Sequence, residues 1–119
     1  MILTTGKRTR LEAEYQAQVN LWAKACKVPP PTVRVCKRKS GTYYHHRKLI
    51  RIAPDCHMST LVHEFAHHIS TARGHGKAFR VALIAAATIA YGLPSRYPWT
   101  QEYQTIRIWA FKHGLVSSD

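Results

Sequence analysis

The chain has 119 residues, of which 45% are hydrophobic, and its 18 Lys and Arg outnumber 6 Asp and Glu to give a formal net charge of +12. This length predicts a single domain over residues 1–119 with a small packed core. No apolar run approaches the roughly 18 residues of a membrane-spanning helix, and the N-terminus has no signal-peptide core, so we expect a cytoplasmic protein, free or associated with the nucleoid, without a membrane partner.

The first element expected along the chain is a helix that begins at Thr9. Thr9 and Glu12 form a capping-box pattern, in which the hydroxyl and the carboxylate satisfy backbone amides of the first turn. Apolar residues then recur at helical spacing and predict one buried face. They are Leu11, Tyr15, Val19, Trp22 and Cys26. Three prolines at positions 29–31 end the helix.

Three short strands are expected next. Val33 and Val35 alternate with polar residues, and residues 42–45 and 49–52 have the composition of strands. Short basic turns separate them, which predicts a small three-stranded antiparallel meander with one face in solvent. If the strand over 49–53 lies at the sheet edge beside the helix that follows it, an extended substrate could pair with it.

Three helices complete the expected order. The first follows Asp55, a candidate N-cap, and it ends before Gly74 and Gly76. Its apolar stripe contains Met58, Leu61, Val62, Phe65, Ala66 and Ile69. The next two helices have the stripes Phe79, Ala82, Leu83, Ala86, Ala87 and Ala90, and then Trp99, Tyr103, Ile106, Ala110 and His113. The expected fold class is therefore α+β: an N-terminal helix, the meander, and an active-site helix followed by two further helices.

A metal-binding motif lies on the helix after the strands. His63 and His67 are four residues apart, so both imidazoles lie on one helix face and can bind the same ion. In an H-E-x-x-H arrangement the glutamate, here Glu64, takes a proton from a water molecule on the metal. His75 can supply a third ligand if the chain reverses at Gly74. Three ligands leave the open fourth position of a catalytic zinc site.

These residues are similar to a known family. H-E-x-x-H at 63–67 followed by H-G-x-x-F at 75–79 resembles the signature of the SprT/Spartan zinc metalloproteases. The resemblance covers roughly residues 41–83 and implies a zincin-like fold that cleaves peptide bonds in a protein or peptide substrate. Eukaryotic members of the family cleave proteins bound or crosslinked to DNA, so DNA-associated proteins are candidate substrates. The implied Zn²⁺ ligands are His63, His67 and His75, and the implied general base is Glu64.

The chain departs from the family in two respects. The loop between His67 and His75 is short, and this sequence contains no C-x-x-C pair, so it lacks the zinc ribbon of many bacterial relatives. Its three cysteines, Cys26, Cys36 and Cys56, are expected to be buried thiols in a reducing compartment. We therefore expect a minimal SprT-like metallopeptidase domain, of the size found in phage proteins.

Two alternatives stay open. The third metal ligand could be Glu102, as in zincins that use a downstream glutamate, although Gly76 and Phe79 beside His75 favour the histidine. The function could also differ: the chain could be a basic nucleic-acid-binding protein with a structural metal or none, or a zinc hydrolase that acts on RNA. Glu64 argues against a structural site, which needs no base and supplies a fourth protein ligand.

A basic segment overlaps the strands and indicates DNA or RNA as a partner. Its cations are Arg34, Lys37, Arg38, Lys39, Arg47, Lys48 and Arg51. Tyr43 and Tyr44 lie among them, and a mixture of cations and aromatic rings is typical of surfaces that bind single-stranded nucleic acid. The alternative is a solvated sheet face whose tyrosines pack inward.

Several further polar residues are secondary candidates. His45 and His46 are interpreted as exposed residues beside a strand turn, with a role near the substrate as the alternative. His68 is interpreted as a bystander to the metal site. A donor that stabilises the transition state is expected downstream of the motif. The candidates for this donor are Arg96, Tyr97, Tyr103 and His113.

Overall fold

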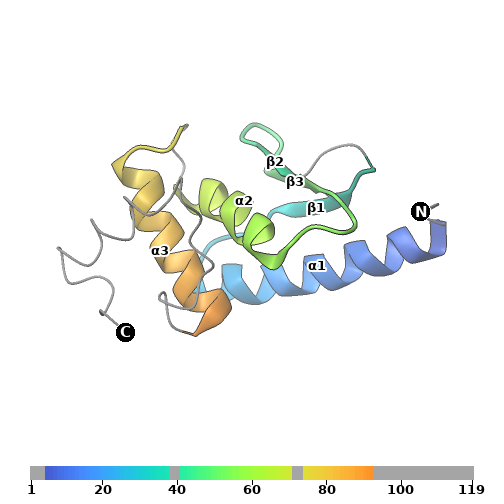
Figure 1. The fold of residues 1–119 in the computed structure, drawn as a ribbon. Helices are drawn as coiled ribbons and strands as arrows, with labels where there is room; N and C mark the ends of the chain where they lie inside the picture. The colour runs from blue at the N-terminus through green and yellow to red at the C-terminus, as the bar shows by residue number, and fades with distance from the viewer. Residues whose placement is uncertain (1–4, 38–40, 71–73, 93–119) are drawn as a thin grey trace.

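The structure, a computed structural model, describes residues 5–37, 41–70 and 74–92. Its elements in chain order are α1 (Thr5–Cys26), β1 (Thr32–Val35), β2 (Gly41–Tyr44), β3 (Leu49–Ile52), α2 (Met58–Ser70) and α3 (Lys77–Tyr91). In Figure 1, α1 extends along one side of the molecule, the sheet and α2 lie above it, and α3 crosses near its C-terminal end. Three helices and a three-stranded sheet confirm the α+β class. The helix expected over 99–113 lies outside the described residues.

The sheet is mixed, so the expected antiparallel meander is wrong. The strand order is β1-β3-β2, and β3 pairs antiparallel with β2 but parallel with β1. The condition for substrate pairing along strand 49–53, a position at the sheet edge, is not met because this strand is central. Ile50 and Ile52 of β3 are fully buried, and the central position pairs both backbone edges of this apolar strand, which a sequential meander would not do.

Side chains of α1 cover the outer edge of β1. The Val33 N–H donates to Gln16 Oε1 at 2.8 Å, and the Val35 N–H donates to Glu12 Oε1 at 2.9 Å. Gln16 Nε2 also donates to the Pro31 carbonyl at 2.8 Å. These bonds satisfy amides that an edge strand otherwise presents to solvent or to another chain. The edge of β1 is therefore closed by α1.

The expected start of the first helix is wrong. α1 begins at Thr5, so Thr9 lies inside the helix and not at its N-cap. The carboxylate of Glu12 binds the backbone of β1 instead of the first turn of its own helix. A capping box is a local pattern, whereas this partner is 23 residues away along the chain, and such a partner leaves no local signal.

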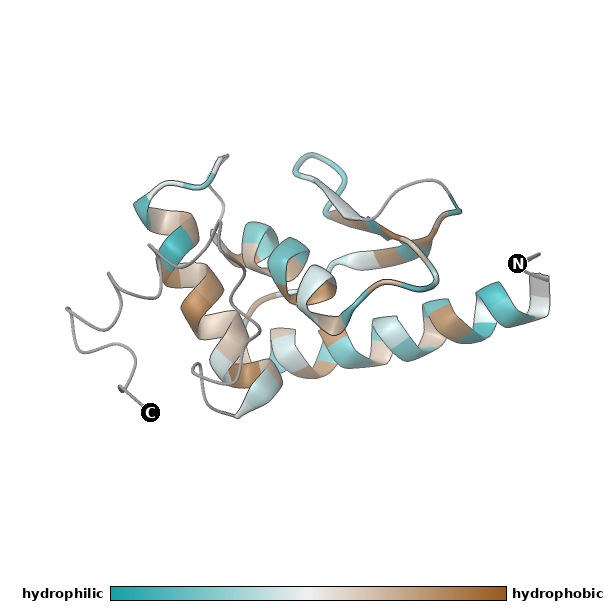
Figure 2. Cartoon of the chain, in the orientation of Figure 1, coloured by the Kyte–Doolittle hydropathy of each residue, from teal (hydrophilic) through white to brown (hydrophobic). Residues whose placement is uncertain are grey.

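One face of the sheet forms the core and the other faces outward, as the alternation in the sequence predicted. Burial alternates along all three strands, and α2 packs against β2 and β3 while α3 packs along α2. The buried residues on the strands are Val33, Val35, Tyr43, Ile50 and Ile52. Trp22 of α1 meets Phe65 of α2 edge to face, with ring centroids 5.6 Å apart. Figure 2 shows apolar residues on the strands and along α3, and hydrophilic residues on the first turns of α1 and on the β2–β3 turn.

His68 belongs to this core and not to the metal site. Its Nε2–H donates to the Pro29 carbonyl at 2.7 Å, so its Nδ1 accepts the hydroxyl proton of Tyr43 at 2.8 Å. Burial is the largest cause that lowers the pKa of His68, which keeps the ring in this neutral form. The imidazole thus joins α2 to β2 and to the segment before β1, and it turns Tyr43 inward.

Two further expectations concern the membrane and the cysteines. In the part of the chain that the structure describes, no helix is both long and apolar enough to cross a membrane.

Cys26, Cys36 and Cys56 are free thiols that are half-buried and not fully buried as expected. Burial raises the pKa of Cys26 and Cys56, which favours the protonated, less reactive thiol.

Candidate metal centre

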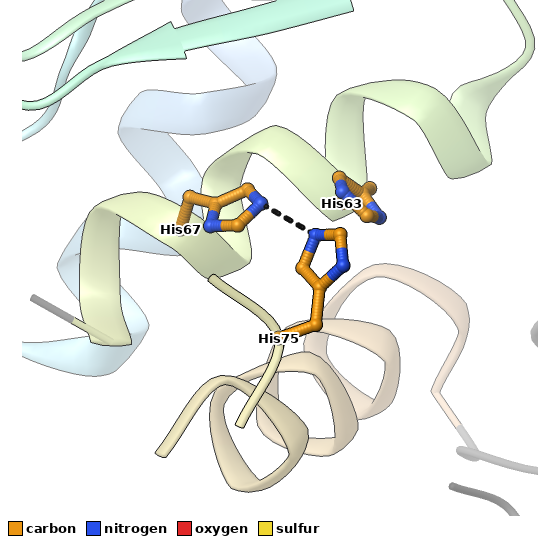
Figure 3. A group of neighbouring side chains, drawn as sticks. All are labelled: His63, His67 and His75. Atoms are coloured by element: carbon orange, nitrogen blue, oxygen red, sulfur yellow. Dashed lines mark hydrogen bonds between the residues drawn. The ribbon is translucent and has the colours of Figure 1, made fainter. Parts of the chain in front are cut away.

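Three histidines from two parts of the chain converge at one point (Figure 3). α2 carries His63 and His67 one turn apart, with ring centroids separated by 5.0 Å. His75 comes from the segment before α3, and its ring centroid lies 5.1 Å from each of the other two. One nitrogen of each ring lies within 4.8 Å of the others, so these three residues could hold a metal ion. The spacing in the sequence predicted this convergence.

A glycine in the left-handed region lies just before His75. Gly74 has φ of 80°, a conformation that residues with a side chain rarely adopt, and it lies where the chain turns back towards α2. Gly76 is the N-cap of α3 with φ of −76° and ψ of −163°, which other residues also adopt.

The ring of Phe79 packs against all three imidazoles. It lies in the first turn of α3, is fully buried, and its ring centroid is 4.4 Å from that of His67, 4.6 Å from His75 and 5.0 Å from His63. Nδ1 of His67 is buried, and no described residue forms a hydrogen bond with it. Ring packing on Phe79 therefore orients His67, in place of the acceptor that usually fixes a ligating histidine.

The spacing and protonation of the histidines fit a divalent metal ion. Nε2 of His67 and Nε2 of His75 are 3.2 Å apart, and two nitrogens bound to one tetrahedral zinc ion are about 3.4 Å apart. Burial and then the neighbouring imidazoles lower the pKa of His63 to about 4, and the same causes lower the pKa of His67 to about 4. Both rings are therefore neutral at pH 7, and the neutral imidazole is the form that binds a metal.

Glu64 lies on the same helix but faces the sheet. Its side chain is 8% exposed, and it packs beneath the first residue of β2: a Cβ added to Gly41 would lie 3.2 Å from Glu64 Oε2 and 2.7 Å from Thr60 Cγ2. Desolvation by burial raises the pKa of Glu64 to about 7. A carboxyl group with a pKa near the ambient pH can both accept and release a proton readily. Its role as a base stays a prediction.

Sequence reasoning missed two residues at this site. His45, interpreted as exposed, is half-buried, with its ring centroid 6.2 Å from that of His67 and 4.9 Å from that of Tyr43. Gly41 packs directly on Glu64, and a glycine within a strand is a known signal of close backbone approach. No comparable signal marks His45, because its position depends on how β2 lies across α2.

Of the two tyrosines expected among the cations of the basic segment, one is buried and the other is half-buried. Tyr43 is buried and bonded to His68, and the ring of Tyr44 lies under the guanidinium of Arg51, 5.5 Å from its Cζ. Both rings are therefore engaged within the protein. Several candidates lie outside the described residues. They are Arg38, Lys39, Arg96, Tyr97, Glu102, Tyr103 and His113.

Comparison with known proteins identifies no relative. No protein-family model, no curated protein and no solved structure matches this chain. The similarity to the SprT/Spartan family consequently rests on the motif residues and on the order of the elements.

The contact between Gly41 and α2 predicts that Gly41→Ala destabilises the protein by about 1–3 kcal/mol, the usual range for overpacking. The added methyl group would lie 2.7 Å from Thr60 Cγ2, so β2 or α2 must move. Urea unfolding measures the loss. The double variant Gly41→Ala/Thr60→Ser removes the methyl group that clashes and should recover most of the stability, with Thr60→Ser alone as the control. An unchanged unfolding free energy in Gly41→Ala would contradict this packing.

The shifted pKa values predict that the metal-free protein becomes more stable as the pH rises from about 4 to 6.5. His63 and His67 have ordinary pKa values of 6.5 and folded values of about 4, so protons bind the unfolded chain more tightly. Their contribution to stability is fully present above pH 6.5 and is lost as the pH falls towards 4. His68, whose pKa is also lowered, acts in the same direction.

Ionisation of Glu64 opposes the rise in stability with pH, so a Glu64 variant serves as the control. Its pKa rises from 4.5 to about 7 on folding, so stability is lost as the pH increases through that range. Three histidines outweigh one carboxyl group, and Glu64→Gln should make the rise in stability with pH steeper. Urea unfolding at several pH values measures both slopes. A stability that falls between pH 4 and 6.5 in both proteins would disprove the neutral buried imidazoles.

Proposed function

We propose that this chain is a zinc-dependent metallopeptidase of the SprT-like kind with a zincin-like fold. The observation that carries the proposal is the set of three imidazole nitrogens within 4.8 Å of one another, on and beside a helix that also bears a buried carboxyl group with a pKa near 7. His63, His67 and His75 would bind the zinc ion, and Glu64 would be the general base. Three protein ligands leave a fourth position open, as in catalytic zinc sites.

The zinc ion, Glu64 and the three imidazoles would each have a different role in hydrolysis. Bound zinc supplies a Lewis acid that polarises the substrate carbonyl and makes water a nucleophile at neutral pH. Glu64 accepts a proton from the attacking water and delivers it to the nitrogen of the leaving amine. The pKa of about 7 suits both transfers, because neither protonation state is strongly favoured. Neutral imidazoles add no charge of their own, which leaves the full charge of the ion to act on the substrate.

An extended peptide substrate would pair with the outer edge of β2. This strand lies at the end of the order β1-β3-β2 and packs against α2, whereas α1 covers the outer edge of β1. A peptide paired with β2 would pass close to Glu64, beneath Gly41, and to His45 just after the strand. Backbone pairing provides affinity with little dependence on side chains, so we expect broad specificity. DNA-associated substrates and a cytoplasmic location stay predictions.

A hydrolysis assay tests the proposal and its rivals. The purified chain loaded with one equivalent of zinc is expected to cleave an unstructured protein such as casein, to stop when a chelator is added, and to recover when zinc is restored. Cleavage of RNA but not casein would instead support a zinc hydrolase that acts on RNA. A folded protein that takes up no zinc would contradict the proposal and favour a basic nucleic-acid-binding protein.

A further inference from the structure

A second concave site lies on the face of the sheet opposite α2. It is a hollow of about 550 Å³ between the N-terminal half of α1, the outer face of β1 and β3, and the β2–β3 turn. Its lining includes Arg8, Glu12, Arg34, Arg47 and Arg51. None of the metal-site histidines contributes to it. We call this feature the arginine hollow.

The hollow concentrates positive charge from three separate parts of the chain. Arg34 and Arg51 are paired neighbours on β1 and β3, Arg8 comes from the first turn of α1, and Arg47 comes from the β2–β3 turn. The first turns of α1 and the β2–β3 turn are among the most hydrophilic segments in Figure 2. Sequence reasoning missed Arg8, because only the folded chain brings the start of α1 beside the strands.

The lining contains little negative charge to offset these four cations. Among the described residues, Glu12 is the one acidic side chain in the lining. Its Oε1 already accepts the Val35 N–H, and its Oε2 lies 4.0 Å from Arg34. Arg51 is held over the ring of Tyr44, a cation–π contact that restricts its side chain before any ligand binds. Four guanidinium groups around one hollow repel one another, and an anionic ligand would relieve that repulsion.

We infer that the arginine hollow binds the phosphodiester backbone of a nucleic acid. Guanidinium groups form paired hydrogen bonds with phosphate oxygens, which a lysine cannot do, and the cations among the described lining residues are all arginines. A chain with a net charge of +12 gains further affinity from counterion release. No aromatic side chain is among the described residues that line the hollow, and phosphate contacts carry no sequence information, so binding should not depend on base sequence.

A membrane surface fits the same hollow less well. Proteins that bind membrane surfaces combine cations with exposed apolar side chains that enter the lipid. The large apolar residues exposed in the described part of the chain are Leu21, Met58 and Val81, and none of them lines the hollow. The inference is also independent of the metal centre, because no residue is shared between the two sites.

The test is fluorescence anisotropy with a labelled 20-nucleotide single strand, titrated at several salt concentrations from about 0.05 M upward. The variant Arg34→Gln/Arg51→Gln is compared with Lys24→Gln/Lys77→Gln, which loses the same charge from exposed positions outside the hollow. We expect the arginine variant to bind about 10-fold or more weakly, and its slope of log K against log salt to be shallower by about 1.4, which is two phosphate contacts. The lysine variant should keep the wild-type slope and lose less than about 3-fold.

Three further measurements complete the test. Arg34→Lys/Arg51→Lys keeps the charge but removes the paired hydrogen bonds, and we expect an affinity between those of the wild type and the glutamine variant. If the glutamine variant does not fold, Arg8→Gln/Arg47→Gln replaces it, since both residues are exposed on a helix and a turn. Equal losses in the arginine and lysine variants would overturn the inference in favour of diffuse charge. Binding to vesicles with about one-third anionic lipid, without binding to the oligonucleotide, would overturn it in favour of a membrane surface.

Discussion

Glu64→Gln is expected to lower the rate of peptide hydrolysis by about 10²- to 10⁴-fold, the usual contribution of a general base. The glutamine amide has nearly the same shape as the carboxyl group but cannot accept the proton of the attacking water. Zinc binding should be unchanged, because Glu64 packs under Gly41 and is not one of the three clustered donors. The fold should also persist, since the carboxyl group is buried with a raised pKa and its ionisation costs stability at neutral pH.

For each purified variant, the initial rate of peptide hydrolysis and the amount of bound zinc are measured. Glu14→Gln is the matched control, because it makes the same chemical change at an exposed position on α1 and should leave the rate unaltered. A Glu64→Gln protein that keeps more than about a tenth of the wild-type rate would rule out this residue as the base. Loss of zinc together with activity would show that Glu64 supports the metal site instead of the proton transfer.

His75→Ala is expected to weaken zinc binding by more than about 100-fold, which exceeds the loss usually seen when a supporting partner of a metal ligand is removed. The reason is that His75 contributes one of three nitrogens, and its Nε2 lies 3.2 Å from that of His67. The metal-free protein should keep its stability, because His75 is exposed and its removal leaves no buried cavity. Competition with a chromogenic chelator gives the affinity, and urea unfolding checks the fold.

His46→Ala is the control for this experiment. His46 is an exposed histidine in the β2–β3 turn, so its loss removes an imidazole without touching the cluster, and zinc affinity should match the wild type. If His75→Ala also retains full affinity, the third ligand lies elsewhere. Glu102 would be the first residue to examine, and the similarity to the SprT/Spartan signature would lose its main support.

The elements that sequence reasoning placed well are those whose signal is local and repeated. The stripe of α2 runs through Leu61, Val62, Phe65 and Ala66, all of them buried, because a helix repeats its buried face every three or four residues. The same repeat predicted that His63 and His67, four residues apart, lie on one face of this helix. Burial of Phe79 was also expected, because it begins the apolar stripe of the next helix.

The elements placed wrongly depend on partners far away along the chain. Glu12 resembles half of a capping box, yet it binds Val35 on β1. The pattern of β3 shows a strand with alternate burial, but alternation does not say which strand lies beside it, and β3 proved central. Alternation in β2 left open whether its two tyrosines face solvent or the core, and the distant residue His68 is what holds Tyr43 inside.

By itself, the sequence determined the α+β class, the helix that carries two of the histidines, the reversal at Gly74 and the three residues that could hold a metal ion. These follow from residue type and short-range spacing, which act within a few turns of the chain. The tertiary structure decided the strand order, the burial and raised pKa of Glu64, the approach of His45 and the gathering of four arginines on the outer face. Each of these depends on which segments pack together, and packing between distant segments is set by the shape of the whole core and not by any local pattern.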